Sequence, residues 1–230
     1  MSSATAVMTI WTSTIGKKAV MAVTGLILVG FVFLHMVGNL KIYFGEEHFN
    51  AYAAFLRTMG APMFAEEQAL WMARAVLLVS VALHIVAAAQ LTQRSWSARP
   101  QRYARKDAVA ATYAARTMRW SGVIVVLFVV YHILHFTLGK VGYAPGQFQP
   151  LSVYQNVVAG FSVWYVSVFY IAAMILLGLH LYHGVWSMFQ TLGVNARTNG
   201  FYRGLATVLS VIIVLGNISI PIAVLARWVH

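Results

Sequence analysis

Five long apolar runs separated by polar stretches dominate the pattern of hydrophobic and polar positions along the chain. Each run reaches about the 20 residues that an α-helix needs to cross the hydrocarbon core of a bilayer. The pattern therefore predicts an all-α integral membrane protein, a bundle of five transmembrane helices in one membrane domain, residues 1–230. The expected spans are residues 19–40, 70–93, 120–138, 161–189 and 205–226.

The connection between the first two spans has a weaker pattern. Phe49, Tyr52, Phe55 and Leu56 recur there at helical spacing. Such a pattern fits a short amphipathic helix lying at the membrane interface. A packed loop explains the same residues equally well.

Composition narrows the function classes. The chain is 60% hydrophobic and only 9% charged, which excludes a soluble domain. It has no cysteine, so it carries no covalently bound c-type haem, no cysteine-ligated iron–sulfur cluster and no disulfide. The net charge of +11 lies in short connections between spans, so we expect no nucleic-acid partner.

The placement of charge predicts the topology. Basic residues precede the first span and recur in residues 94–119 and around Arg197, whereas four of the five acidic residues lie in the first connection. Basic loops mark the cytoplasmic side of a membrane protein. We expect a multi-pass protein of the inner (plasma) membrane, with a cytoplasmic N-terminus and basic loops that contact lipid head groups.

Four histidines carry the candidate chemistry. His35, His84, His132 and His180 each lie in a different expected span. An imidazole is costly in hydrocarbon, so an intramembrane histidine marks a functional site. Two facing imidazoles are what a haem iron needs at its two axial positions.

The depths of these histidines sort them into two pairs. With a helical rise of about 1.5 Å per residue, His84 and His180 lie roughly 15 Å from the cytoplasmic ends of their spans. His35 and His132 lie roughly 20–25 Å deep. The pattern predicts an inner haem b held by His84 with His180 and an outer haem b held by His35 with His132.

Two further histidines leave the ligand choice open on spacing alone. His135 and His183 each lie three residues beyond a candidate ligand, hence on the same helix face. A spare histidine could hydrogen-bond a haem propionate or a quinone. A plain interhelical hydrogen bond would account for it as well.

Several segments resemble one known family, the single-chain, five-helix, dihaem cytochrome b anchor of succinate:quinone oxidoreductases (respiratory complex II) and fumarate reductases. They are LHMVGN (34–39), FNAYAAFL (49–56), RWSGVIVVLFVVYHILHF (119–136) and LHLYHGVWSMF (179–189). The resemblance extends over about residues 17–221. The family's ligand lies four residues before a Gly-x-Trp-Ser motif, which selects His180 over His183. The family's third-helix ligand corresponds to His132 rather than His135.

The resemblance implies the rest of an enzyme complex. A flavoprotein subunit with FAD would oxidise succinate on the cytoplasmic side, and an iron–sulfur subunit would carry the electrons to this chain. The chain would hold two haem b groups and reduce a quinone, in this subfamily usually menaquinone. It would carry no catalytic residue for succinate itself, and a higher oligomer of the whole complex is left open.

The quinone site has candidate contacts on both sides of the membrane. The candidate contacts on the outer side are Glu47, His48, Tyr52 and His135, and those on the cytoplasmic side are Trp120, Ser121 and His183.

Two alternatives stay open at the level of sequence. The dihaem anchor of another respiratory enzyme, such as a hydrogenase or a formate dehydrogenase, would show the same histidines. A haem-free ion transporter could also use them, although the spans lack the acidic ligands that such a site favours.

Overall fold

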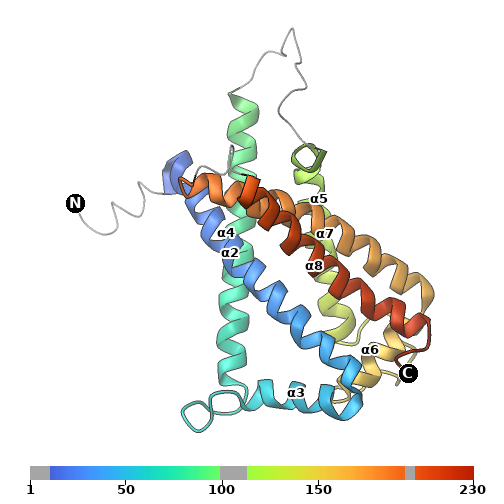
Figure 1. Cartoon of the computed structure of the whole chain (residues 1–230). Coiled ribbons are helices and arrows are strands. Elements are labelled where there is room, and N and C mark those ends of the chain that lie inside the picture. Colours follow the sequence, from blue (N-terminus) through green and yellow to red (C-terminus); the bar gives the residue numbers. More distant parts are fainter. Residues whose placement is uncertain (1–10, 99–112, 195–199) are drawn as a thin grey trace.

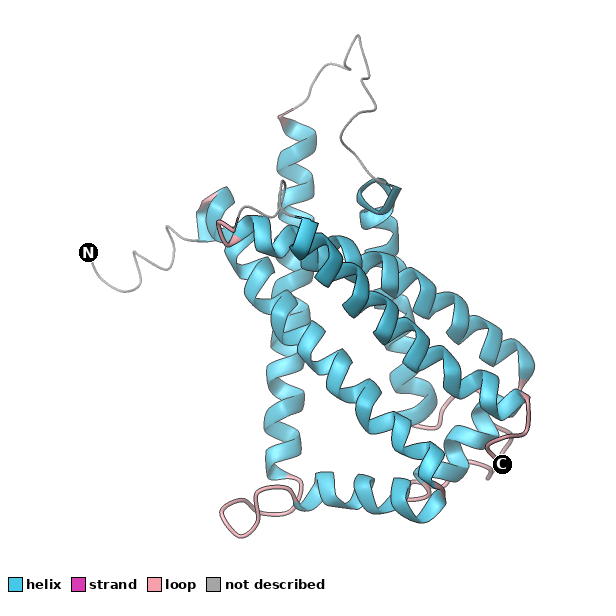
Figure 2. Ribbon diagram, viewed as in Figure 1, coloured by secondary structure: helices cyan, strands magenta, loops and turns pink. Residues whose placement is uncertain are grey.

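The computed structural model describes residues 11–98, 113–194 and 200–230, without the side chains of residues 113–117. This part of the chain is helical, with loops between the helices (Figure 2). Five helices are long and apolar enough to cross a membrane: α2 (Thr14–Asn39), α4 (Gln68–Ser97), α5 (Tyr113–His132), α7 (Trp164–Thr191) and α8 (Gly200–Leu225). The expectation of an all-α, multi-pass membrane protein is confirmed at this level.

The long helices form two hairpins and a fifth element that packs on one of them. α2 packs against α4 and α5 packs against α7, each pair crossing at an angle, whereas α8 runs alongside α7 (Figure 1). α2 also contacts α7 and α8, which joins the two hairpins. The most buried apolar residues lie on α7 and α8, whereas α4 is largely exposed along its length. Exposed leucine, valine and phenylalanine side chains on the outside of these helices suit contact with lipid tails.

The first helix begins earlier than the apolar pattern predicts. Ser13 caps α2, because its hydroxyl accepts a hydrogen bond from the backbone N–H of Gly16 at 2.8 Å. Lys17 and Lys18 therefore lie inside the helix rather than before it. The ammonium of Lys17 donates to the carbonyl of Trp11, so the charge helps to fix the start of the helix.

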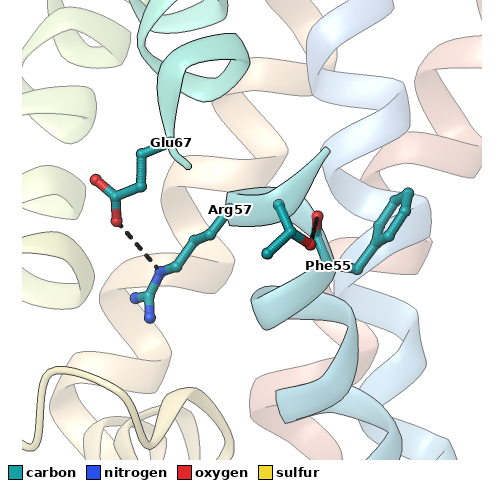
Figure 3. A network of polar contacts seen from close by, with 4 residues as sticks. Phe55, Arg57 and Glu67 are labelled. Carbon is teal, nitrogen blue, oxygen red and sulfur yellow. Dashed lines mark hydrogen bonds and ion pairs between the residues drawn. The ribbon is translucent and has the colours of Figure 1, made fainter. Parts of the chain in front are cut away.

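The first connection folds into η1 (Leu40–Phe44) and a real helix, α3 (Glu46–Thr58), which crosses the end of the bundle (Figure 1). Phe49 is buried on this helix, with 4% of its surface exposed, as an amphipathic helix requires. Phe55 on the same helix is 57% exposed. At the end of α3, Arg57 pairs with Glu67 at 3.6 Å and the Thr58 hydroxyl donates to the carbonyl of Phe55 (Figure 3).

The fourth expected span is interrupted. α6 (Val153–Ser162) ends one residue before α7, and Val163 between them has an extended backbone. The Ser167 hydroxyl donates to the carbonyl of Phe161 at 2.6 Å, so it satisfies a backbone group that the break frees. The long helix therefore begins at Trp164, not at residue 161.

A π-helical turn, η3 (Ile133–Thr137), continues α5. The N–H of Leu138 reaches back five residues to the carbonyl of Ile133 at 3.0 Å, which is the bond that defines a widened turn. Because His135 lies in this turn, it does not continue the α-helical spacing that ends at His132.

The basic connections fall mostly outside the described residues. Arg99, Arg102, Arg105, Lys106 and Arg197 lie there, and the side chain of Arg116 is not described either. At the expected cytoplasmic end, the structure describes the basic side chains of Arg94, Arg119 and Arg203 and of the two lysines of α2.

Candidate functional site

The inner pair of histidines joins the two hairpins. His84 on α4 and His180 on α7 face each other with their ring centres 6.4 Å apart and their planes at 60°. Both rings are half-buried. Residues 96 positions apart in the chain thus meet at one point inside the bundle.

The outer pair joins the other two helices of the hairpins. His35 on α2 and His132 on α5 have their ring centres 5.9 Å apart, with planes at 89°. Phe31 stacks on the His35 ring at 5.3 Å, one helical turn away. The structure places His132, and not His135, opposite His35.

Both spacings fit one metal ion between two nitrogen atoms. A metal–nitrogen bond of about 2 Å on each side puts the centres of two opposed imidazoles roughly 6 Å apart. In the described residues no three His, Asp or Glu side chains gather around one point. Each pair therefore offers two nitrogen ligands and no more, which suits a metal whose other ligands come from a porphyrin.

A glycine lies beside each ring of the inner pair. A Cβ atom at Gly25 would lie 3.5 Å from Cε1 of His84, and one at Gly122 would lie 3.6 Å from Cε1 of His180. These are ordinary contact distances, so the backbone of α2 and that of α5 lie close to the two rings. α2 and α5 thus make equivalent approaches to the two imidazoles.

A hydroxyl lies beside the Nδ1 atom of each inner histidine. Oγ1 of Thr24 is 3.1 Å from Nδ1 of His84, and Oγ of Ser121 is 3.5 Å from Nδ1 of His180. Both hydroxyl residues are buried. From the sequence, we expect Ser121 only as a propionate or quinone contact and do not expect Thr24 at the site.

A signal for these hydroxyls exists in the sequence. Thr24-Gly25 lies eleven residues before His35, and Ser121-Gly122 lies eleven residues before His132. His84 follows His35 by 49 residues, and His180 follows His132 by 48 residues. The two hairpins therefore repeat one arrangement of hydroxyl, glycine and histidine.

His135 is turned toward α7. Its Nδ1 atom is 3.0 Å from the hydroxyl of Tyr170, which in turn is 3.5 Å from Nδ1 of His132. The His135 ring is fully buried, and its Nε2 atom has no hydrogen-bond partner in the described part of the chain. Nothing in the sequence pattern pointed to Tyr170, because the contact depends on how α5 and α7 pack.

Two glycines and a tyrosine close around His135. A Cβ atom at Gly142 or at Gly160 would come within 2.7 Å or 2.8 Å of Nε2, so neither position accepts a side chain without a shift. The ring of Tyr143 lies 4.8 Å from that of His135, and its hydroxyl donates to the carbonyl of Asn156 at 2.9 Å. Burial raises the pKa of Tyr143, which keeps this donor protonated.

His183 follows His180 by three residues on α7. Its ring packs edge-on against Trp186 at 6.2 Å, and the guanidinium of Arg203 lies over the Trp186 ring at 5.4 Å. Nδ1 of His183 is buried without a partner among the described residues. His180 rather than His183 therefore faces His84.

The other candidate quinone contacts lie at the two ends of the bundle. Trp120 is 73% exposed, and Glu47 and His48 are exposed as well. The His48 ring packs edge-on against Phe44 at 6.4 Å. Tyr52 lies under the ammonium of Lys41 and fills the space that a side chain at position 38 would need.

Comparison with known proteins gives no match to a protein family, a curated protein or a solved structure. The functional assignment therefore depends on the residues and on the geometry of the two histidine pairs.

Proposed function

We propose that this chain is the membrane-anchor cytochrome b subunit of a succinate:quinone oxidoreductase or fumarate reductase. Its role is to pass electrons between an iron–sulfur partner and a membrane quinone through two b haems. The observation that supports this most strongly is the pair of bis-imidazole sites at 6.4 Å and 5.9 Å, each built from both hairpins.

The inner haem is assigned to His84 and His180, and the outer haem to His35 and His132. Bound by these residues, the haems would supply one-electron redox chemistry. The chain's own residues hold the two imidazoles of each pair opposite each other, and a glycine lies beside each inner ring. Burial and hydrogen bonds to the ligands are the means by which a protein sets the potentials of such centres.

The two sites lie at different levels along the bundle. The inner pair lies at the level of Thr24 on α2, and the outer pair lies at the level of His35 on the same helix. Eleven residues of α-helix separate these levels by about 16 Å. Electrons would thus cross a substantial part of the membrane within this one chain.

The partner subunits are proposed from the family resemblance. An iron–sulfur subunit would dock on the basic end of the bundle, and a flavoprotein subunit with FAD would carry out succinate chemistry beyond it. At this end Arg94 ties α4 to the start of α2, because it donates to the Thr14 hydroxyl at 3.1 Å and to the carbonyl of Thr12 at 2.7 Å. These contacts give the docking face a defined shape near Lys17.

The quinone, proposed to be menaquinone, would accept electrons from the outer or the inner haem. Three outer candidates, Glu47, His48 and Tyr52, lie on α3, which follows α2 and η1. Two inner candidates, Trp120 and Ser121, lie on α5. A quinone needs protons as well as electrons, so a site with ionisable groups such as Glu47 and His48 is chemically suitable.

Haem content and partner identity test the proposal together. The complex should be purified through a tag on this chain and assayed for haem b as the pyridine haemochrome. We expect two haem b groups per chain and a copurifying subunit with bound flavin. Fewer than one haem b per chain would overturn the dihaem function, and a nickel- or molybdenum-containing partner would assign the chain to a hydrogenase or a formate dehydrogenase instead.

A further inference from the structure

Three of the four proposed ligands share a feature that the pairing alone does not explain. Each has its Nδ1 atom next to a hydroxyl that comes from another helix. The contacts are Thr24 of α2 with His84 of α4, Ser121 of α5 with His180 of α7, and Tyr170 of α7 with His132 of α5.

The direction of the first hydrogen bond follows from the bonds around it. The Thr24 hydroxyl donates its only hydrogen to the carbonyl of Val20, one turn back on α2, at 2.7 Å. The oxygen can then only accept from His84, so the hydrogen of the neutral imidazole lies on Nδ1. The lone pair is consequently on Nε2, the atom that remains for a metal.

Ser121 makes the same arrangement on the other hairpin. Its hydroxyl donates to the carbonyl of Met118 at 3.0 Å, so it too acts as an acceptor toward Nδ1 of His180. Ser121 is only 2% exposed and Thr24 only 5%, which keeps water from competing for these bonds. Both inner imidazoles thus keep the lone pair of Nε2 free for a metal.

We propose that Thr24 and Ser121 are positioning residues that fix the tautomer of the inner ligands and lower the reduction potential of the inner haem. An imidazole whose N–H donates a hydrogen bond is a more basic ligand, and a more basic ligand stabilises the ferric state. Because only a metal ligand can act in this way, the role rests on the proposed function of the two pairs.

Tyr170 extends the same principle to the outer pair. It has one hydroxyl hydrogen and two imidazole neighbours, at 3.0 Å and 3.5 Å. If Nε2 of His132 binds iron, Nδ1–H of His132 donates to Tyr170, and Tyr170 donates to Nδ1 of His135. His135 then carries its own hydrogen on the buried Nε2 atom between Gly142 and Gly160.

The recurrence of the hydroxyl in both hairpins supports a functional role over accidental packing. Thr24-Gly25 and Ser121-Gly122 precede His35 and His132 by the same eleven residues, yet each contacts the histidine of the neighbouring helix. A hydroxyl without a role would not need to recur beside a glycine at matching places in both halves.

Redox titration of the purified complex tests the role. The variants are Thr24→Val, Ser121→Ala and their combination, and the potentials of the two haems are read separately from their absorption bands. We expect the inner potential to move in the positive direction in each single variant and further in the double variant, while the outer potential stays unchanged. Tyr170→Phe is expected to move the outer potential and leave the inner one unchanged.

Matched variants separate this role from a general effect on the fold. Thr207→Val removes an exposed threonine of α8 that makes the same backward bond, to the carbonyl of Arg203 at 2.9 Å, and should change neither potential. Thr24→Ser keeps the hydroxyl and should retain the wild-type value. Loss of the inner haem alone in Thr24→Val, with Thr24→Ser intact, would also support the role.

Other results would overturn it. An unchanged inner potential in both Thr24→Val and Ser121→Ala would show that the hydroxyls do not act on the ligands, even with two haems present. Loss of both haems in Thr24→Val would show that the residue supports the bundle instead. A wild-type complex without haem would overturn the proposed function first and this role with it.

Discussion

At the scale of single residues, the two histidine pairs differ in what surrounds them. The inner rings have a hydroxyl and a glycine each, on α2 and on α5. The outer pair has Phe31 stacked on one ring and Tyr170 beside the other. If the two pairs bind haem as proposed, differences of this kind would give the two haems different potentials.

Replacing His183 tests the assignment of the ligand on α7. His183 packs against Trp186 and not toward His84. We expect His183→Ala to keep both haems, as seen in the reduced-minus-oxidised absorption spectrum of the purified complex. Loss of the inner haem in this variant would transfer the ligand role from His180 to His183.

The packing around His135 gives a prediction for stability. A Cβ atom at Gly160 would lie 2.8 Å from the buried ring, so Gly160→Ala should cost about 1–3 kcal/mol through overpacking. Gly30→Ala is the control, because no atom lies within 4 Å of its Cβ position. Thermal denaturation in detergent would measure both, and equal stability of the two variants would contradict the close packing of His135.

At the scale of elements, the sequence predicts the long helices well and their interruptions poorly. The long helices follow from unbroken apolar runs, because backbone groups in lipid must be satisfied within a helix. The break at Val163 and the π-turn after His132 lie inside such runs, and no proline marks either of them. At the break, the Ser167 hydroxyl donates to the carbonyl of Phe161, a bond that the apolar pattern does not predict.

Some residues of the candidate site can be predicted from the sequence and others cannot. His35, His84, His132 and His180 could be found from the sequence, because an imidazole in an apolar run is conspicuous. Thr24 could have been found from the repeated eleven-residue spacing. Tyr170 could not, because a tyrosine in an apolar helix is ordinary and its contact with two histidines arises only when α5 and α7 pack.

α3 packs on the bundle with one face, which includes Phe49. Phe49 is buried in the main apolar core, whereas Phe55 on the same helix is 57% exposed. We expect Phe49→Ala to cost about 3–5 kcal/mol and Phe55→Ala to cost almost nothing. Thermal unfolding followed by circular dichroism compares the two, and an equal loss would contradict the orientation of α3.

A smaller effect is expected where α3 ends. The Arg57–Glu67 pair spans 3.6 Å, and both side chains are partly exposed. Exposed pairs of this kind contribute about 0–1 kcal/mol because solvent screens them. Arg57→Ala should therefore unfold within a few degrees of wild type in the same experiment, and a much larger loss would show that the pair is essential to the loop.

At the scale of the whole molecule, each histidine pair takes one residue from each hairpin. α2 and α4 supply His35 and His84, and α5 and α7 supply His132 and His180. The hairpins are therefore joined at two levels through the same kind of site. A metal between each pair would tie the two halves together, so haem binding and assembly of the bundle should be coupled.

The haem content of double variants tests the pairing most directly. Each histidine replaced alone by alanine should leave one haem b per chain, measured as the pyridine haemochrome. The double variant within a pair, His84→Ala with His180→Ala, should also leave one, because both residues serve the same haem. The double variant across pairs, His35→Ala with His84→Ala, should leave none. Equal haem content in the two double variants, with the complex still assembled, would contradict two separate bis-histidine sites.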